Sequence, residues 1–123
     1  MHQHGKLNYV ELPAKDLTAT KAFFSAAFDW NFVDYGPDYV AFSDQGLDGG
    51  FFRSEQSSTS ATGGALLVFY SSDIKTTLAK VQQCGGTVIK AIFDFPGGCR
   101  FHFTEPSGNE FHNVGRKRHA PRQ

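Results

Sequence analysis

The chain begins with a stretch in which apolar and polar residues alternate. From Lys6 to Pro13 the period of two predicts a β-strand that places Tyr9 and Glu11 on one face. Asp16 then caps a predicted helix over residues 17–28, because its side chain can accept hydrogen bonds from the first turn. The period of two returns in three segments bounded by turn residues, WNFVDYG, YVAFSD and LDGGFFRSE. The predicted order is strand, helix and three strands.

The second half of the chain repeats this order. The apolar segment ALLVFYS predicts a strand, and Asp73 can cap a helix that ends at Gly85-Gly86. Three more strands are predicted from TVIKAIFDF, GCRFHFTEP and NEFHNVG. The repeat divides a single domain, residues 1–123, into module 1 at about 6–55, a linker of small and polar residues at 56–64, module 2 at about 65–114 and a basic tail at 115–123. Neither module can bury a core alone, so we expect the two to pair.

Composition narrows the class of protein without naming a function. Hydrophobic residues make up 40% of the 123 residues, and the formal net charge of zero disfavours nucleic-acid binding. No stretch approaches the roughly 20 apolar residues of a membrane span, and no signal peptide is recognisable, so we expect a cytoplasmic protein. The basic tail suits a frayed terminus, or a contact with nucleic acid or an acidic partner. The 13 phenylalanines can fill a small core or line an apolar pocket.

Three long segments of the chain resemble the vicinal oxygen chelate superfamily, which includes glyoxalase I, extradiol dioxygenases and bleomycin-resistance proteins. These segments are YVELPAKDLTATKAFFSAAFDW, SSDIKTTLAKVQQCGGTVIKAIFDFPGG and RFHFTEPSGNEFH. The resemblance implies an α+β fold of two tandem βαβββ modules that form a half-barrel sheet with a concave cavity. It also implies a homodimer that takes a small-molecule ligand. The linker is long enough for the modules to pair within one chain or across two chains.

Members of this superfamily that use a metal take ligands from the first and last strands of each module. Carried onto this chain, the ligand positions fall on Tyr9, Gly50, Leu66 or Leu67, and His112. Glycine and leucine have no donor atom, so we expect no complete metal site, no cofactor and no glyoxalase I reaction. Weak binding of a divalent ion stays open, because Glu11 and Glu110 could replace missing ligands.

Strand alternation predicts a polar site in the concave cavity. Arg100 and His102 share one face of their strand, and the superfamily register turns that face toward the cavity. We expect His112, His102 and Glu11 to act as acid–base groups there, and Tyr9, Arg100 and Glu110 to bind the ligand. Structural roles are open for three of these residues: a hydrogen-bonded core histidine for His102, a surface ion pair for Arg100 and a turn contact for Glu110.

Two classes of function fit this expected site. The first is a glyoxalase-like enzyme, with lyase, isomerase or dioxygenase-like activity, that transforms a small oxygen-rich molecule without the usual complete metal site. The second is a metal-free protein of the bleomycin-resistance type that binds and sequesters a small molecule. Turnover with a histidine-dependent pH profile would indicate the enzyme, whereas capture without turnover would indicate the binding protein. The sequence does not choose between them.

Overall fold

The computed structural model describes residues 2–116, so residues 117–123 of the basic tail lie outside the described part of the chain. Two modules of the order β-α-β-β-β follow each other, as the sequence predicts. The first module consists of β1 (Tyr9–Ala14), α1 (Leu17–Phe28), β2 (Phe32–Asp34), β3 (Tyr39–Phe42) and β4 (Asp48–Arg53). The second consists of β5 (Leu67–Tyr70), α2 (Ile74–Gln83), β6 (Thr87–Phe95), β7 (Gly98–Thr104) and β8 (Glu110–Gly115). A short 3-10 turn, η1 (Ser60–Thr62), lies between them.

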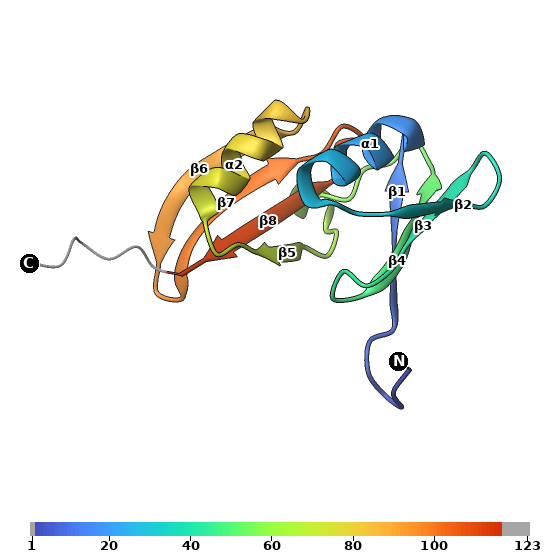
Figure 1. Ribbon diagram of the computed structural model, residues 1–123, viewed down its shortest axis with the longest axis horizontal. Helices are drawn as coiled ribbons and strands as arrows, with labels where there is room; N and C mark the ends of the chain where they lie inside the picture. The colour runs from blue at the N-terminus through green and yellow to red at the C-terminus, as the bar shows by residue number, and fades with distance from the viewer. Residues whose placement is uncertain (1, 117–123) are drawn as a thin grey trace, which may run out of the picture.

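Each module forms its own four-stranded mixed sheet, and the two sheets are not closed into a barrel (Figure 1). The strand orders are β1-β4-β3-β2 and β5-β8-β7-β6. In both sheets the first strand runs parallel to the last one, and the other neighbours are antiparallel. The register places Gly50 opposite Glu11 in the first sheet and His112 opposite Val68 in the second. The α+β fold of two tandem modules is therefore confirmed.

Both helices begin where the sequence predicts. The Asp16 carboxylate accepts a hydrogen bond from the Ala19 amide at 3.0 Å, and the Asp73 carboxylate caps α2 in the same way through Thr76. These caps satisfy amides that have no partner inside the helix. Gly85 follows α2 with a φ of 103°, which glycine adopts without strain. Among the described residues, neither helix is long and apolar enough to cross a membrane.

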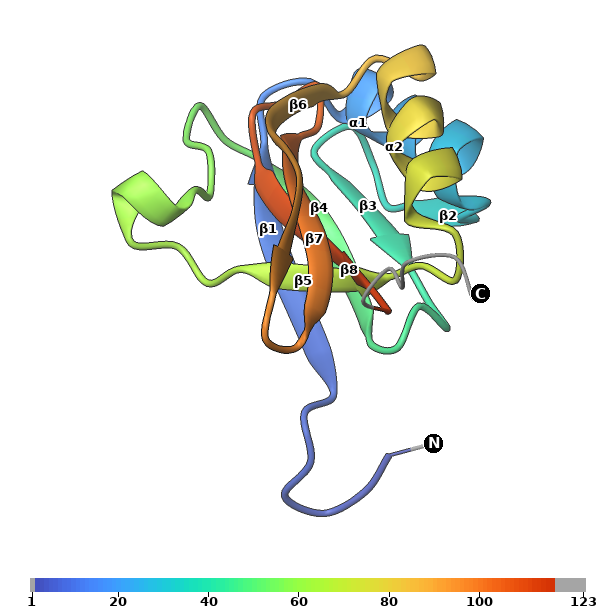
Figure 2. The same ribbon diagram turned by 90° about the vertical axis from the view of Figure 1, so that its left-hand side faces the viewer.

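The two modules share one aromatic core, which contains most of the phenylalanines. Phe24 of α1 stacks on Phe51 of its own sheet at 5.5 Å between ring centroids. It also contacts Phe69 at 6.3 Å and Phe111 at 5.3 Å, both in the second sheet. The helices therefore lie together on the inner side of both sheets (Figure 2). Burying each such ring contributes about 1.5–3 kcal/mol, so the modules stabilise each other.

The opposite face of each sheet is left without a helix, and we call it the open face. On the first sheet the open face carries Tyr9 and Phe52, which are 44% and 39% exposed. On the second sheet it carries Val68 and Tyr70. Alternation along each strand separates these residues from the buried phenylalanines of the core. Apolar side chains on both open faces indicate surfaces that can bury further area.

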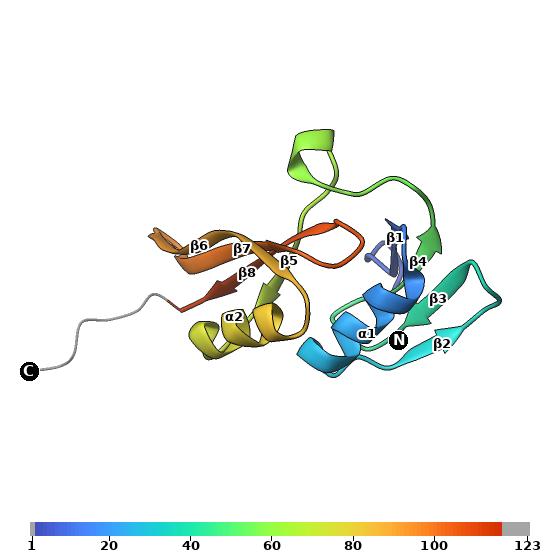
Figure 3. The same cartoon turned by 90° about the horizontal axis from the view of Figure 1, so that it is seen from above.

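The linker has a defined fold that its composition does not predict. A capping box of Thr59 and Thr62 holds η1, and the turn lies on the side of the sheets away from the helices (Figure 3). The Ser58 amide donates to the side-chain oxygen of Asn109 at 2.8 Å, and the Glu110 amide donates to the Ser58 carbonyl at 2.8 Å. These bonds fix the linker against the β7–β8 turn.

A buried carboxylate joins that turn to helix α1. Glu105 is 2% exposed and accepts hydrogen bonds from the Thr20 hydroxyl at 2.6 Å and from the Asn109 amide group at 2.6 Å. The Ser107 amide also donates to it at 2.8 Å. Burial raises the pKa of Glu105, although these donors oppose the rise. The network links the two modules through polar contacts in addition to the shared core.

Candidate functional site

Four of the predicted site residues lie together on the open face of the second sheet. Arg100 and His102 stand on β7, and Glu110 and His112 stand on β8. His102 pairs directly with His112 in the ladder, while Phe101 and Phe103 point into the core and are fully buried. The register of β7 is thus the one that the sequence predicts, because a slip by one residue would exchange these faces.

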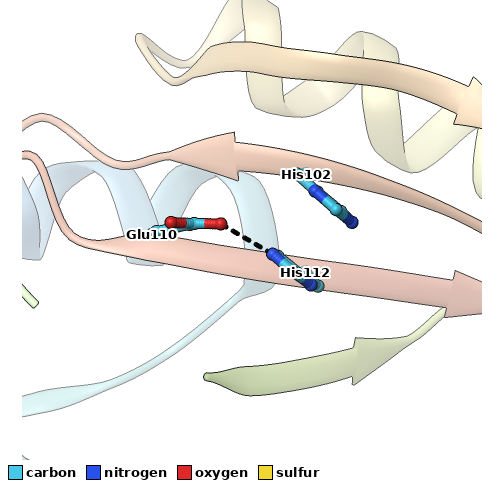
Figure 4. A group of neighbouring side chains, drawn as sticks. All are labelled: His102, Glu110 and His112. Carbon is cyan, nitrogen blue, oxygen red and sulfur yellow. Dashed lines mark hydrogen bonds and ion pairs between the residues drawn. The ribbon is translucent and has the colours of Figure 1, made fainter. Parts of the chain in front are cut away.

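A chain of hydrogen bonds joins three of these side chains. One terminal nitrogen of the Arg100 guanidinium lies 2.5 Å from Nδ1 of His112. On the other side of the ring, Nε2 of His112 lies 2.7 Å from the Glu110 carboxylate, as Figure 4 shows. Arginine can only donate, so Nδ1 accepts. Nε2 then carries the proton and donates to Glu110. The contacts select one tautomer of a neutral imidazole, held between a cation and an anion.

Glu110 is kept ionised by the linker as well as by His112. Burial alone would raise the pKa of Glu110, but hydrogen bonds from the Ser60 backbone, from His112 and from the Ser60 hydroxyl outweigh it and lower the pKa. The Ser60 amide and hydroxyl both donate to one carboxylate oxygen at 2.9 Å. The linker therefore supplies two donors to the site.

His102 differs from His112 in its surroundings. Its ring stacks on that of His112 with centroids 3.4 Å apart, and the Phe93 ring meets it edge-on at 5.5 Å. Burial, followed by the charges of His112 and Arg100, lowers the pKa of His102 to about 4. Nε2 of His102 and Nε of Arg100 are buried and have no hydrogen-bond partner among the described residues. These two atoms have unused hydrogen-bonding capacity, which is unfavourable for buried groups.

The other two predicted residues belong to the open face of the first sheet. The Tyr9 and Tyr39 hydroxyls lie 2.6 Å apart, and Tyr39 donates to the Glu11 carboxylate at 2.9 Å. Burial, together with the bonds to Tyr9 and Glu11, raises the pKa of Tyr39, which keeps its phenol protonated. A Cβ atom at Gly50 would lie 2.1 Å from the Tyr39 hydroxyl. Tyr39 thus fills the space where the superfamily places a ligand.

Tyr39 also belongs to this group of polar side chains, and the sequence pattern does not predict it as a site residue. Tyr39 stands on β3, which pairs with the strand β4 that contains Gly50. Because Gly50 has no side chain, the Tyr39 ring has room beside it, and a glycine within a predicted strand is the feature of the sequence that indicates such a space. The structure brings Tyr9 and Glu11 together, and separately Arg100, His102, Glu110 and His112. No hydrogen bond or ion pair between described residues joins the two groups. Their convergence in one cavity stays a prediction.

The register defines the four superfamily ligand positions in this chain. Leu67 pairs with Phe111 and packs against the core, so the position on the open face is Leu66. Two of the four positions, Gly50 and Leu66, thus have no donor atom. Tyr9 is bound to Tyr39, and His112 is bound on both ring nitrogens. The residues at these positions do not fit the metal centre that the superfamily implies.

Three side chains that can ligate a metal lie close to one another on the open face of the second sheet. Ligand atoms of His102, Glu110 and His112 lie within 4.8 Å of one another. A divalent ion would need a nitrogen of His112 that now contacts Arg100 or Glu110, and it would lie near the Arg100 guanidinium. Like charges at such short range repel, so this set fits a cation poorly while Arg100 keeps its place.

Comparison with solved structures gives the same fold. A glyoxalase-related enzyme from Fulvimarina pelagi superposes with a TM-score of 0.76 at 14% identity, covering 91% of this chain and 88% of that chain. Lactoylglutathione lyase from Agrobacterium tumefaciens gives 0.69 at 20% identity, with coverage of 92% and 95%. TnmS3, an antibiotic-binding protein from Streptomyces sp. CB03234, gives 0.68 at 17% identity, with coverage of 94% and 100%. At these identities the likeness shows the fold alone.

Family-level comparison is more specific than the structural likeness. No curated protein matches the chain. A family model does match, over residues 6–112, and this range includes module 1, module 2 as far as the middle of β8, and all six predicted site residues. The chain therefore belongs to the Glyoxalase/Bleomycin resistance protein/Dioxygenase superfamily.

Proposed function

We propose that the open face of β7 and β8 binds a small oxygen-rich molecule and moves a proton on it without a bound metal. The observation that supports this is the hydrogen-bonded chain from Arg100 through His112 to Glu110. A cation, an imidazole and a carboxylate in sequence are the elements of metal-free acid–base chemistry. Arg100 forms no ion pair with a carboxylate of the described residues, so its charge is free for an anionic oxygen of the ligand.

The roles follow from the contacts. An anionic oxygen that pairs with Arg100 draws the guanidinium away from Nδ1 of His112, which then can accept a proton from the ligand. Glu110 stabilises the imidazolium that forms, because it already accepts the hydrogen bond from Nε2. His102 is neutral above about pH 4, so it offers a hydrogen bond at Nε2 and supports the ring of His112 by stacking.

Glu11 and Tyr9 enter the proposal through a second copy of the chain. Both open faces carry exposed apolar side chains; the first also carries the Glu11 carboxylate, and the second carries the Arg100 guanidinium. A homodimer that sets the first sheet of one protomer opposite the second sheet of its partner would bring these groups together. In that arrangement Glu11 is the additional acid–base group and Tyr9 contacts the ligand. We also propose that the protein acts in the cytoplasm, as expected from the sequence.

Capture without turnover is the second candidate, and two observations favour it. Both nitrogens of His112 are engaged, and the low pKa of His102 makes that ring a weak base. A fold neighbour of similar length is an antibiotic-binding protein. The same Arg100 and the same open face would then hold a ligand that does not react.

Pyruvate tests both candidates, because it carries a carboxylate beside a carbonyl and has exchangeable methyl protons. If the protein is an enzyme, it should bind pyruvate in deuterated buffer and speed the exchange of the pyruvate methyl protons for deuterium. The loss of the methyl signal in proton NMR measures this exchange. His112→Ala should abolish the exchange while circular dichroism shows an intact fold, and Arg100→Gln should weaken binding. Binding without exchange would favour capture. Absence of any binding, with a folded protein, would contradict the proposed recognition of an oxygen-rich anion by Arg100.

A further inference from the structure

A separate cavity of about 230 Å³ lies between the two modules. Its walls come from both sheets and from the segment after α1, and the principal ones are Trp30, Phe42, Leu47, Leu67, Phe69 and Phe111. Phe111 stands between Glu110 and His112 in β8 but points to the opposite face of the sheet. The cavity is therefore on the core side, whereas the histidine site is on the open face.

The lining is aromatic and aliphatic. Trp30 packs 4.3 Å from Phe42 and 5.9 Å from Phe69 between ring centroids, so several ring faces and edges meet there. Among residues 2–116 no charged side chain lines the cavity, and the amide of Gln45 at its rim already donates to the Ser43 carbonyl. Gln45 and Gly46 are exposed, so the cavity reaches the surface at this rim. An occupant would have to be neutral and mostly apolar, because a charge would lose its hydration there.

Size restricts the occupant further. An apolar cavity of about 150 Å³ is known to stay dry and to bind benzene. A cavity of about 230 Å³ has room for one substituted ring or a small bicyclic molecule, but not for a helix or a strand. The tail at residues 117–123 is a poor occupant as well, since it contains Lys117, Arg118 and Arg122 and no large apolar side chain.

We propose that the cavity between the modules binds one small, neutral aromatic molecule. Planar rings suit walls made of Trp30, Phe42 and Phe69, because aromatic pairs stack or meet edge to face over such distances. The occupant would touch residues of both modules at once, so it would also stabilise their pairing. This inference does not depend on the proposed chemistry at His112.

Trp30 reports on the cavity directly, because it is the only tryptophan in the chain and lines the wall. Iodobenzene is the probe, since its heavy atom quenches indole fluorescence on contact. We expect saturable quenching of Trp30 by iodobenzene and little quenching by iodide ion, because the side chain is only 7% exposed. Quenching that rises linearly with iodobenzene and never saturates would be collisional and would overturn the proposal.

Two variants test whether iodobenzene binds in this cavity. Leu47→Phe and Leu67→Phe each add volume at the wall and should weaken iodobenzene binding by about tenfold or more. Val33→Phe is the matched control, because Val33 is 56% exposed on β2 and does not line the cavity. Leu47 lies in a loop and is half-buried, so a larger side chain there should not prevent folding. Leu47→Phe therefore tests the proposal even if circular dichroism shows that Leu67→Phe does not fold. Unchanged binding in folded Leu47→Phe would refute the proposal.

Discussion

Two histidines on the same open face have different surroundings. His112 has a partner for each nitrogen, an arginine on one side and a carboxylate on the other. His102 has a stacked ring, a phenylalanine edge and no hydrogen bond to Nε2. Contacts rather than residue type therefore distinguish the two imidazoles: two partners hold the ring of His112, whereas burial lowers the pKa of His102.

The neutral state of His102 leads to a pH prediction. In the unfolded chain a histidine has a pKa of about 6.5, but in the folded protein burial lowers the pKa of His102 to about 4. Between these values the unfolded chain binds the additional proton, so this group makes the folded state less stable as the pH falls from about 6.5 toward about 4. NMR of the histidine ring protons at a series of pH values should show one titration midpoint at about pH 4, which belongs to His102. His102→Gln should remove that signal and flatten the loss of stability, whereas a midpoint near the ordinary value would disprove the burial argument.

Gly50 and Leu66 lead to a prediction about metal content. Protein purified without added ions should contain no near-stoichiometric zinc, nickel or iron by elemental analysis. Two of the superfamily ligand positions have no donor atom, and Arg100 repels a cation from the cluster of His102, Glu110 and His112. A thermal-shift screen with divalent ions should show only weak stabilisation. Arg100→Gln is the informative variant, since it removes the charge and should strengthen binding of added Zn²⁺. Stoichiometric metal in the wild-type protein would show that the side chains rearrange around an ion.

Among the elements of the fold, the β7–β8 turn connects helix α1, the linker and the histidine site. Glu105 and Asn109 bind α1 and the end of β1, while Glu110 binds the linker through Ser60. A turn of a few residues thereby fixes the position of one module relative to the other.

Thr20 offers the clearest test of this connection. Thr20→Val keeps the side-chain volume but removes a 2.6 Å hydrogen bond to the buried Glu105 carboxylate, so it should lower the free energy of unfolding by about 1–3 kcal/mol. Urea unfolding followed by circular dichroism measures the loss. Thr18→Val, at an exposed position of the same helix, should change stability by less than about 0.5 kcal/mol. Equal effects of the two substitutions would mean that the network contributes nothing specific.

Local patterns predict local structure well in this chain. Asp16 and the 17–28 helix follow from a capping side chain and apolar spacing, and alternation places Arg100 with His102 on one face. The linker fold does not follow, because the donors and acceptors that hold it, such as Asn109 and Glu110, are about fifty residues away. The role of Tyr39 depends in the same way on the glycine of another strand. Sequence periodicity carries no information on such long-range partners.

At the scale of the whole molecule, the shared core determines where each open face points. Phe24 packs against the core side of both sheets, so each open face points away from helix α1. The sequence left pairing within or across chains undecided, since the phenylalanines of either module could pack in both ways. No hydrogen bond or ion pair between described residues joins the two groups of site residues, and we propose that a surface from a second chain completes the cavity.

This separation leads to the prediction that the protein is a homodimer. Light scattering at micromolar concentration should give twice the mass of one chain, because apolar residues of both open faces become buried on association. Tyr70→Glu should shift the protein toward the monomer, since Tyr70 is 63% exposed on the open face of β5 and a buried charge is unfavourable. Leu7→Glu is the control, as Leu7 is more exposed but precedes β1. A monomeric wild-type protein, or equal effects of the two substitutions, would show that the open faces do not meet, and Glu11 would then act apart from His112.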